Sequence, residues 1–204
     1  MKNKILFSFI VLAGMAVSSA MAQVLPSKQE TLKTLTLVNS YFMKKYADYT
    51  LPSKTDRVRP SNIWTRGVYY EGLMELYKIF PKEEYYQYAY GWSDFHKWGM
   101  RNGTTTRNAD DQCCGQTYID LYNICPTSPA MLKDIKACMD MLVNTPQVDD
   151  WTWIDAIQMG MPVLAKLGKL TGNTAYFDKM WDMYAYSRNT HGGGLFNLKD
   201  GLWW

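Results

Sequence analysis

Two short segments hold carboxylates whose setting could support acid–base chemistry. The first, DDWTWIDA, runs from Asp149 to Ala156, and in it Asp155 has aromatic residues close by in the sequence. Aromatic neighbours remove water from a carboxyl and raise its pKa toward the range of a general acid. Trp153, two residues earlier, offers a flat face on which a sugar ring can stack. A helix N-terminus would act in the opposite direction, by favouring the charged carboxylate, so the direction of the net pKa change stays open.

The second segment, NADDQ, covers residues 108–112 and offers two adjacent acids. Asp110 is expected to face the site, where its charge would raise the pKa of Asp155 further if the two lie close together. Asp111 is expected to be an N-terminal helix residue stabilised by the helix dipole. Trp64 and Arg66 lie further upstream. Arg66 either binds a substrate carboxylate through its planar guanidinium group or pairs with a neighbouring Asp.

Helices must position these residues. Apolar residues recur at i, i+3, i+4 and i+7 over most of the chain, and the alternation typical of strands is nearly absent, so the sequence predicts an all-α fold. The breaks between helices are short and contain Pro, Gly, Asn or Thr. The predicted helices cover residues 28–47, 64–80, 82–100, 113–124, 130–143, 154–171 and 174–188.

An internal repeat organises these helices into hairpins. Three hairpins align at Gly67, Gly115 and Gly160, with steps of 48 and 45 residues. The first helix of each pair is the more apolar, as expected of an inner helix, and the second is more amphipathic, as expected of an outer one. Hairpins stacked in this way form an open solenoid or a closed double ring.

A polar residue lies five positions before each of the three glycines: Asn62, Asp110 and Asp155. Helix N-capping is the structural interpretation of this position, because Asn and Asp are preferred caps. In a closed ring, however, the starts of the inner helices surround one shared funnel, so the same residues could also face a site. Asn62, Trp64 and Arg66 are therefore taken with Trp153 as candidate substrate-binding residues.

The N-terminus indicates export. A basic start is followed by an apolar run and by Ala20-Met21-Ala22, which predicts a signal peptide over residues 1–22, cleaved before Gln23. The alternative, a membrane anchor, is disfavoured because a span needs about 20 apolar residues. Since the peptide holds two lysines and no acid, cleavage lowers the formal net charge from +3 to +1. This near-neutral balance argues against nucleic acid as a partner, and no membrane partner is expected after cleavage.

The four cysteines predict neither a disulfide framework nor a metal site. Cys113 and Cys114 are adjacent, and the chain has only two histidines, His96 and His191, which are far apart in the sequence. Buried free thiols are expected at all four positions, which include Cys125 and Cys138. His96 is expected to be a packed or surface residue, not a catalytic one.

The segments that hold the two carboxylates also carry a family resemblance. NADDQCCGQTYIDLY (residues 108–122) and WTWIDAIQMGMP (residues 151–162), with TGN at 171–173 and DGLWW at 200–204, resemble the unsaturated rhamnogalacturonyl hydrolases of glycoside hydrolase family 105. The unsaturated glucuronyl hydrolases of family 88 are more distant relatives. The resemblance implies an (α/α)6 barrel with a central pocket and no metal or organic cofactor. The implied substrate is an oligosaccharide with an unsaturated uronic acid at its non-reducing end.

The resemblance also implies roles for individual residues. Asp155 would be the general acid that protonates C4 and helps to activate the water added at C5 of the double bond. Asp110 would be the second carboxylate, and Trp153 would line the subsite. Many family members carry a Gly-Leu-Phe-Tyr-His segment near the pocket, whereas here Gly194-Leu195-Phe196 continues into Asn197-Leu198.

The number of helices predicts only part of a barrel. About seven of the twelve helices of a six-hairpin ring are expected, so residues 23–204 would form the N-terminal part of a single domain, and residues 1–204 alone would be inactive and prone to associate. Two other functions remain open. One is inverting hydrolysis of an intact glycoside, which needs the two carboxylates roughly 6.5–9.5 Å apart. The other is a non-catalytic helical-repeat protein that binds carbohydrate on a concave face.

Overall fold

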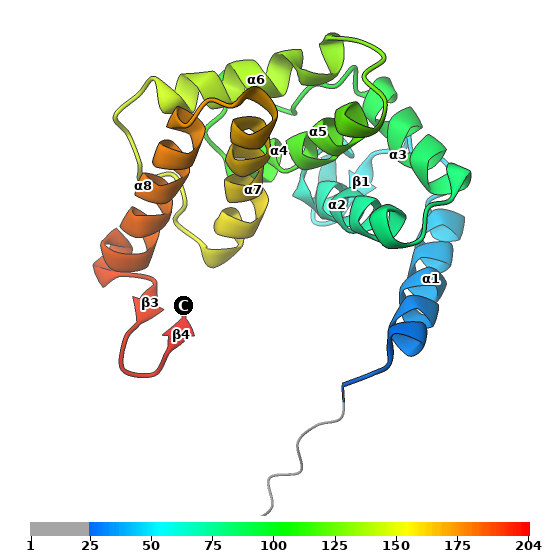
Figure 1. The fold of residues 1–204 in the computed structure, drawn as a ribbon, viewed down its shortest axis with the longest axis horizontal. Coiled ribbons are helices and arrows are strands. Elements are labelled where there is room, and N and C mark those ends of the chain that lie inside the picture. Colours follow the sequence, from blue (N-terminus) through cyan, green and yellow to red (C-terminus); the bar gives the residue numbers. More distant parts are fainter. Residues whose placement is uncertain (1–24) are drawn as a thin grey trace, which may run out of the picture.

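The computed structural model describes residues 25–204, and the predicted signal peptide over residues 1–22 lies outside the described residues. The described chain is mostly helical, as predicted (Figure 1). The helices are α1 (Lys28–Lys45), α2 (Trp64–Ile79), α3 (Glu83–Phe95), α4 (Ala109–Gln112), α5 (Cys114–Ile124), α6 (Ala130–Val143), α7 (Ile154–Thr171) and α8 (Ala175–Asn189). Two one-turn 3-10 helices lie at Gly103–Thr105 and His191–Gly193. Within residues 25–204 no helix is both long and apolar enough to cross a membrane.

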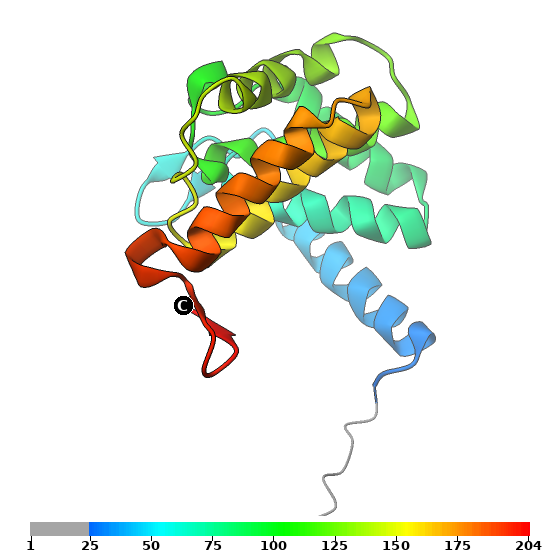
Figure 2. The ribbon, with the colours of Figure 1, turned by 60° about the vertical axis from the view of Figure 1, so that its left-hand side comes forward.

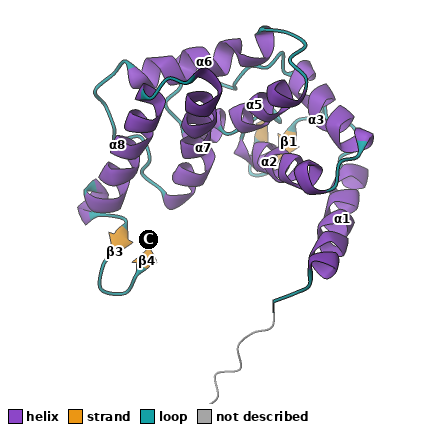
Figure 3. Cartoon of the chain, viewed as in Figure 1, coloured by secondary structure: helices purple, strands orange, loops and turns teal. Residues whose placement is uncertain are grey.

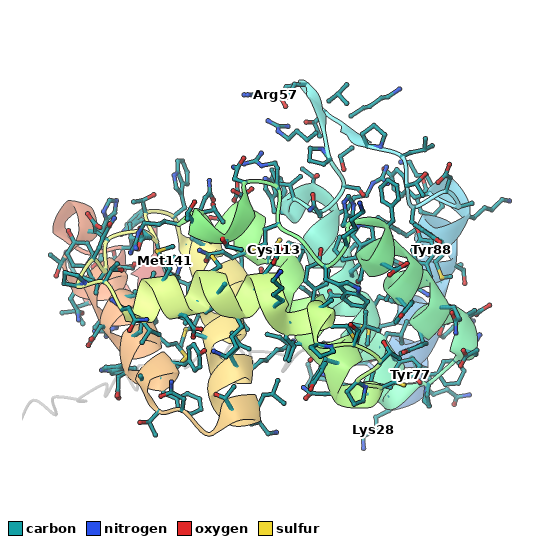
Figure 4. All side chains as sticks on the ribbon, turned by 90° about the horizontal axis from the view of Figure 1, so that it is seen from above. Lys28, Arg57, Tyr77, Tyr88, Cys113 and Met141 are labelled. Atoms are coloured by element: carbon teal, nitrogen blue, oxygen red, sulfur yellow. The ribbon has the colours of Figure 1, made fainter. Side chains whose placement is uncertain are left out.

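The strands form two small antiparallel hairpins, drawn in orange in Figure 3. Strand β1 (Ser53–Lys54) pairs with β2 (Val58–Arg59), and β3 (Phe196–Asn197) pairs with β4 (Leu202–Trp203). Arg57, in the turn between β1 and β2, stands away from the helices (Figure 4).

The predicted repeat appears as three helical hairpins, α2–α3, α5–α6 and α7–α8. The inner helices pack side by side in the order α2, α5, α7, and the outer helix α6 packs against α8. In Figure 1 the elements follow an arc from α1 at one end to the β3–β4 hairpin at the other. Figure 2 shows α7 and α8 running alongside one another as the last hairpin. The arc brings the starts of the inner helices to one side of the molecule.

Local signals explain the helix ends that were predicted well. Helix α1 begins with a capping box, in which Ser27 and Glu30 each bond the other's backbone N–H. Helix α7 covers the predicted range and ends at Gly172, whose φ of 72° lies in the left-handed region that favours glycine. The helix predicted over residues 82–100 is too long, because α3 ends at Phe95. Lys97 and Trp98 then take positive φ values, and the buried Trp98 ring packs into the core.

Aromatic rings fill much of the interface between inner and outer helices. Tyr70 of α2 stacks on Trp92 of α3 with ring centroids 3.9 Å apart, and Trp98 packs edge-on against Tyr118 of α5. All four rings are buried, so most of their surface is removed from water. The high aromatic content therefore serves the core first, and sugar stacking requires rings outside it.

The thiols and His96 largely follow the sequence prediction. All four cysteines are free, and Cys113, Cys114 and Cys138 are buried. Cys125 is exposed, which corrects the prediction for that residue, because it follows the last turn of α5 where the chain leaves the core. The half-buried His96 places its Nε2 2.7 Å from Ser61 Oγ. Burial, with a smaller contribution from a nearby arginine, lowers the pKa of His96 to about 4, as fits a packed neutral histidine.

Candidate active site

A cavity of about 550 Å³ lies where the inner helices begin. It collects the two carboxylate segments and the start of α2 in one place, although they are 40 to 90 residues apart in the chain. Its walls come from α2, α4, α7 and the loops before them: Trp64, Arg107, Asn108, Ala109, Asp110, Asp150, Thr152, Trp153, Asp155, Ala156 and Met159. Four of the six candidate residues named from the sequence line this pocket.

The two carboxylates have different surroundings. Asp110 is half-buried, and its pKa is raised mainly by burial and then by the negative charges of Asp111 and Asp155. Arg101 and Arg59 oppose this rise. Asp155 is exposed on the first turn of α7, so the expected burial of Asp155 among its aromatic neighbours is not found. The prediction was that Asp110 would raise the pKa of Asp155, whereas the effect found in the structure is that of the Asp155 charge on the pKa of Asp110.

Helix capping does not account for the repeated polar position. Helices α2 and α7 begin after Ile63 and Trp153, and neither N-cap side chain bonds the helix. Helix α4 is capped by Asn108, whose Oδ1 accepts a hydrogen bond of 2.8 Å from the backbone N–H of Asp110. The carboxyls of Asp110 and Asp155 are therefore free of capping bonds where they line the pocket.

Asp111, beside the pocket, fixes α4 from within the protein. It is fully buried, and its Oδ1 lies 2.7 Å from Arg101 Nε. Asn102 Nδ2 and Thr106 Oγ1 donate to Oδ2 over 2.7 and 2.8 Å. Asp111 is in the first turn of α4, as predicted, but its partners lie in the preceding loop. This ionic and hydrogen-bonded contact supports the adjacent Asp110 at the pocket.

Two tryptophans present their rings at the pocket. Trp153 is 74% exposed and Trp64 is 45% exposed, whereas most of the other tryptophans are more buried. Large exposed aromatic rings beside a polar cavity are typical of ligand sites. Their flat faces can stack on the apolar face of a sugar ring, as the sequence analysis expected for Trp153.

The structure does not bring Asn62 and Arg66 into this pocket. Asn62 is buried, and its Nδ2 donates 2.8 Å to the carbonyl oxygen of Gly99. Arg66 is also buried and donates to the carbonyl oxygens of Leu51 and Pro52 over 2.8 and 3.3 Å. Both side chains hold loops around the start of α2. Neither of the roles considered for Arg66, binding a substrate carboxylate or pairing with an Asp, matches these contacts.

Arg107 and Asp150 are pocket residues that the sequence analysis missed. Their side chains form a two-pronged ion pair, in which Arg107 Nε and Nη2 lie 2.6 Å from the two carboxylate oxygens. Arg107 also donates to Thr145 Oγ1 over 2.9 Å and to the carbonyl oxygen of Gln147 over 3.2 Å. The signal available in the sequence was the position of these residues: Arg107 directly precedes the NADDQ segment, and Asp150 belongs to the DDWTWIDA segment. With its planar group bound this way, Arg107 anchors the loop that leads to Trp153.

Within residues 25–204, no group of three or more His, Cys, Asp or Glu side chains is arranged to hold a metal ion. The chemistry that the pocket can perform with its own residues is acid–base chemistry between paired carboxyls, beside rings that can hold a sugar.

Comparison with known proteins agrees with this geometry. A family model described as Glycosyl Hydrolase Family 88 matches residues 34–204. A solved structure named as a polysaccharide lyase is 26% identical with a TM-score of 0.73, over 86% of this chain and 49% of that one. A solved glycosyl hydrolase family 88 protein from Bacteroides vulgatus is 23% identical with a TM-score of 0.73, over 88% of this chain and 51% of that one.

The chain thus spans about half the length of these two structures. No match was found among curated proteins. The shared fold confirms the predicted all-α architecture, in which the described hairpins form part of an (α/α)6 ring.

Proposed function

Because the chain belongs to glycosyl hydrolase family 88, we propose that its pocket releases unsaturated uronic acid from lyase-generated, pectin-type oligosaccharides. The observation that carries this proposal is the meeting of Asp110 and Asp155, from two different repeats, in one cavity with the exposed rings of Trp64 and Trp153. The choice of rhamnogalacturonan-derived substrates rests on the resemblance of residues 108–122 and 151–162 to family 105. The predicted signal peptide supports a periplasmic or extracellular place of action.

The proposed reaction is hydration of the C4–C5 double bond. Asp155 gives a proton to C4 and helps to remove a proton from the water whose oxygen bonds to C5. The resulting hemiketal at C5 opens by breaking its bond to the ring oxygen. C1 is then a hemiacetal, which breaks its bond to the next sugar and releases it. Asp110 binds sugar hydroxyls, and Trp153 holds the ring by stacking.

The exposure of the two carboxyls supports this division of roles. Asp110 is the more enclosed of the two carboxyls, and burial, followed by the charges of neighbouring acids, raises its pKa. Asp155 is exposed to the cavity at the start of a long helix, within reach of water. A general acid that also activates water needs such access.

Polysaccharide lyase activity is a second candidate, because one of the structures similar to this chain is named as a lyase. A lyase would remove the C5 proton of an intact uronic acid and expel the group at C4, which creates the double bond that the hydrolase consumes. The two activities therefore change the near-ultraviolet absorbance of the double bond in opposite directions.

The test uses protein expressed from its complete reading frame. Wild type, Asp155→Asn, Asp110→Asn and a control, Asp94→Asn on the exposed surface of α3, are incubated with unsaturated rhamnogalacturonan and glucuronan oligosaccharides and with the intact polymers. Loss of absorbance by wild type and Asp94→Asn, but not by Asp155→Asn, supports the proposal. A rise on intact polymer assigns lyase activity instead. Release of reducing sugar from saturated oligosaccharides without an absorbance change assigns hydrolysis of an intact glycoside, and the anomeric configuration of the product then tells inversion from retention. Binding without turnover assigns a carbohydrate-binding role.

A further inference from the structure

A polar bridge crosses the buried interface of the three inner helices. Glu71 of α2 is buried, and its Oε2 accepts a hydrogen bond of 2.7 Å from Gln158 Nε2 of α7. Gln116 of α5, also buried, donates from Nε2 to the carbonyl oxygens of Gln158 and Met159 over 3.0 and 3.2 Å. Glu71 Oε1 has no hydrogen-bond partner. These three side chains tie α7 to both other inner helices.

Pro162 explains why α7 needs an outside donor at this point. Proline has no backbone N–H, so the carbonyl of Gln158, four residues earlier, lacks its usual helical donor. Gln116 supplies the missing hydrogen bond from α5. At this point α7 therefore depends on a hydrogen bond from α5. Gln158, whose carbonyl accepts that bond, also donates to Glu71 of α2 through its side chain.

This bridge lies one turn from the candidate active site. Met159 and Ala156 line the pocket with Asp155, and Gln158 lies three residues after Asp155 on the same helix. Gly160, two residues after Gln158, packs closely against the loop before α7: a methyl group there would lie 2.8 Å from Trp151 Nε1. A shift of these turns of α7 would move the carboxyl of Asp155 with them.

We propose that Glu71 is a positioning residue for the candidate site: through Gln158 it holds the first turns of α7 against α2, and so fixes the place of Asp155. This inference rests on the proposed function for its effect on turnover, whereas its effect on α7 does not depend on which reaction the pocket performs.

The bridge depends on the protonation of Glu71. Burial raises the pKa of Glu71 to about 7, while the hydrogen bond from Gln158 and the charge of Lys166 on α7 oppose the rise and Asp120 on α5 adds to it. Below this pH the neutral carboxyl accepts from Gln158 without a buried charge. Above it, the buried carboxylate has one oxygen without a donor, which favours opening of the contact to water. The buried thiol of Cys113, which also faces Glu71, has its pKa raised far above this range and stays neutral.

Hydrogen exchange measures this effect without reference to activity. Amide exchange in peptides covering residues 153–161 is compared at pH 5.5 and 8.5, after division by the intrinsic rate at each pH. In wild type we expect exchange on the order of tenfold faster at pH 8.5, because the carboxylate is then the main form. Glu71→Gln, which keeps the acceptor and cannot ionise, should exchange slowly at both pH values. Glu71→Ala should exchange fast at both.

Glu75→Gln is the matched control, because Glu75 is on the same helix, is exposed and pairs with Lys78. It should behave as wild type. The inference is overturned if Glu71→Gln keeps the pH dependence of wild type, or if Glu71→Ala leaves exchange in this segment unchanged. In the turnover assay, kcat/KM of wild type should fall above pH 7 while that of Glu71→Gln stays level up to higher pH. If no variant turns over any substrate, the proposed function fails and the exchange result still decides the role of Glu71.

Discussion

The ion pair between Arg107 and Asp150 is expected to be a main anchor of the loop that carries the DDWTWIDA segment. Asp150 is almost completely buried, with 4% of its side chain exposed, whereas Arg107 is 22% exposed. Arg107→Met keeps most of the side-chain volume and removes every hydrogen bond that Arg107 makes to the loop. The carboxylate of Asp150 is then left with only the hydrogen bond from Gln147.

Loss of one partner of a buried ion pair typically costs about 3–5 kcal/mol of unfolding free energy. The partial exposure of Arg107 lets water reach the site, so we expect the lower end, about 3 kcal/mol. In a domain of this size each kcal/mol lowers Tm by roughly 2–4 °C, which gives a decrease of about 6–12 °C. Asp150→Asn should cost less, because a neutral amide remains hydrogen-bonded and carries no charge.

The assay is a double-mutant cycle followed by circular dichroism of the helices during urea and thermal unfolding. Wild type, Arg107→Met, Asp150→Asn and the double variant are compared, and we expect a coupling of about 1.5–3 kcal/mol between the two sites. Arg57→Met is the control, because Arg57 pairs with Asp56 at the surface, and its Tm should match wild type. A loss below about 1 kcal/mol for Arg107→Met, or additive single variants, would refute the assignment of Arg107 as an anchor.

Three further outcomes are expected. The pKa of Glu71 is raised from 4.5 to about 7, so its contribution to stability is complete below pH 4.5 and is lost as the pH rises from 4.5 through 7. When the free energy of unfolding is measured as a function of pH, wild type should lose about 3 kcal/mol relative to Glu71→Gln over this range. Gly115→Ala should destabilise by about 1–3 kcal/mol in urea unfolding, since a methyl group would overlap Ile135, whereas Gly72→Ala on the open face of α2 should stabilise by up to about 1 kcal/mol. A thiol reagent should label one cysteine, Cys125, in the folded protein and all four in urea.

Helices were predictable from the sequence wherever their ends depend on nearby residues. Helix α6 starts after Pro129 and α7 stops at Gly172, so periodicity and punctuation together gave their ranges. The end of α3 depends instead on distant packing. The five residues directly before Lys97 include no Pro or Gly, yet the chain turns there, where Trp98 packs between Tyr90 and Tyr118. Local propensity carries no information about that contact.

The site was predictable where it depends on the repeat and unpredictable where it depends on pairs that are distant in sequence. Asp110 and Asp155 share a repeat position, and the structure brings both to the pocket. Glu71 was assigned to a helix, but its partner Gln158 is 87 residues further along the chain. The partner of Arg107 is 43 residues away. One sequence shows which residue types are present and does not show which of them meet.

Asn62 marks the point where the repeat stops predicting the site. It holds the same offset as the two carboxylates, yet it lies just before Ile63, the N-cap of α2, and its side chain donates to the carbonyl oxygen of Gly99 in the loop after α3. Trp64, the first residue of α2, reaches the pocket in its place. The first repeat thus contributes an aromatic face where the next two contribute carboxyls. The third repeat supplies both a carboxyl, Asp155, and an exposed ring, Trp153, so Trp64 of the first repeat adds a second ring to a pocket that already holds one.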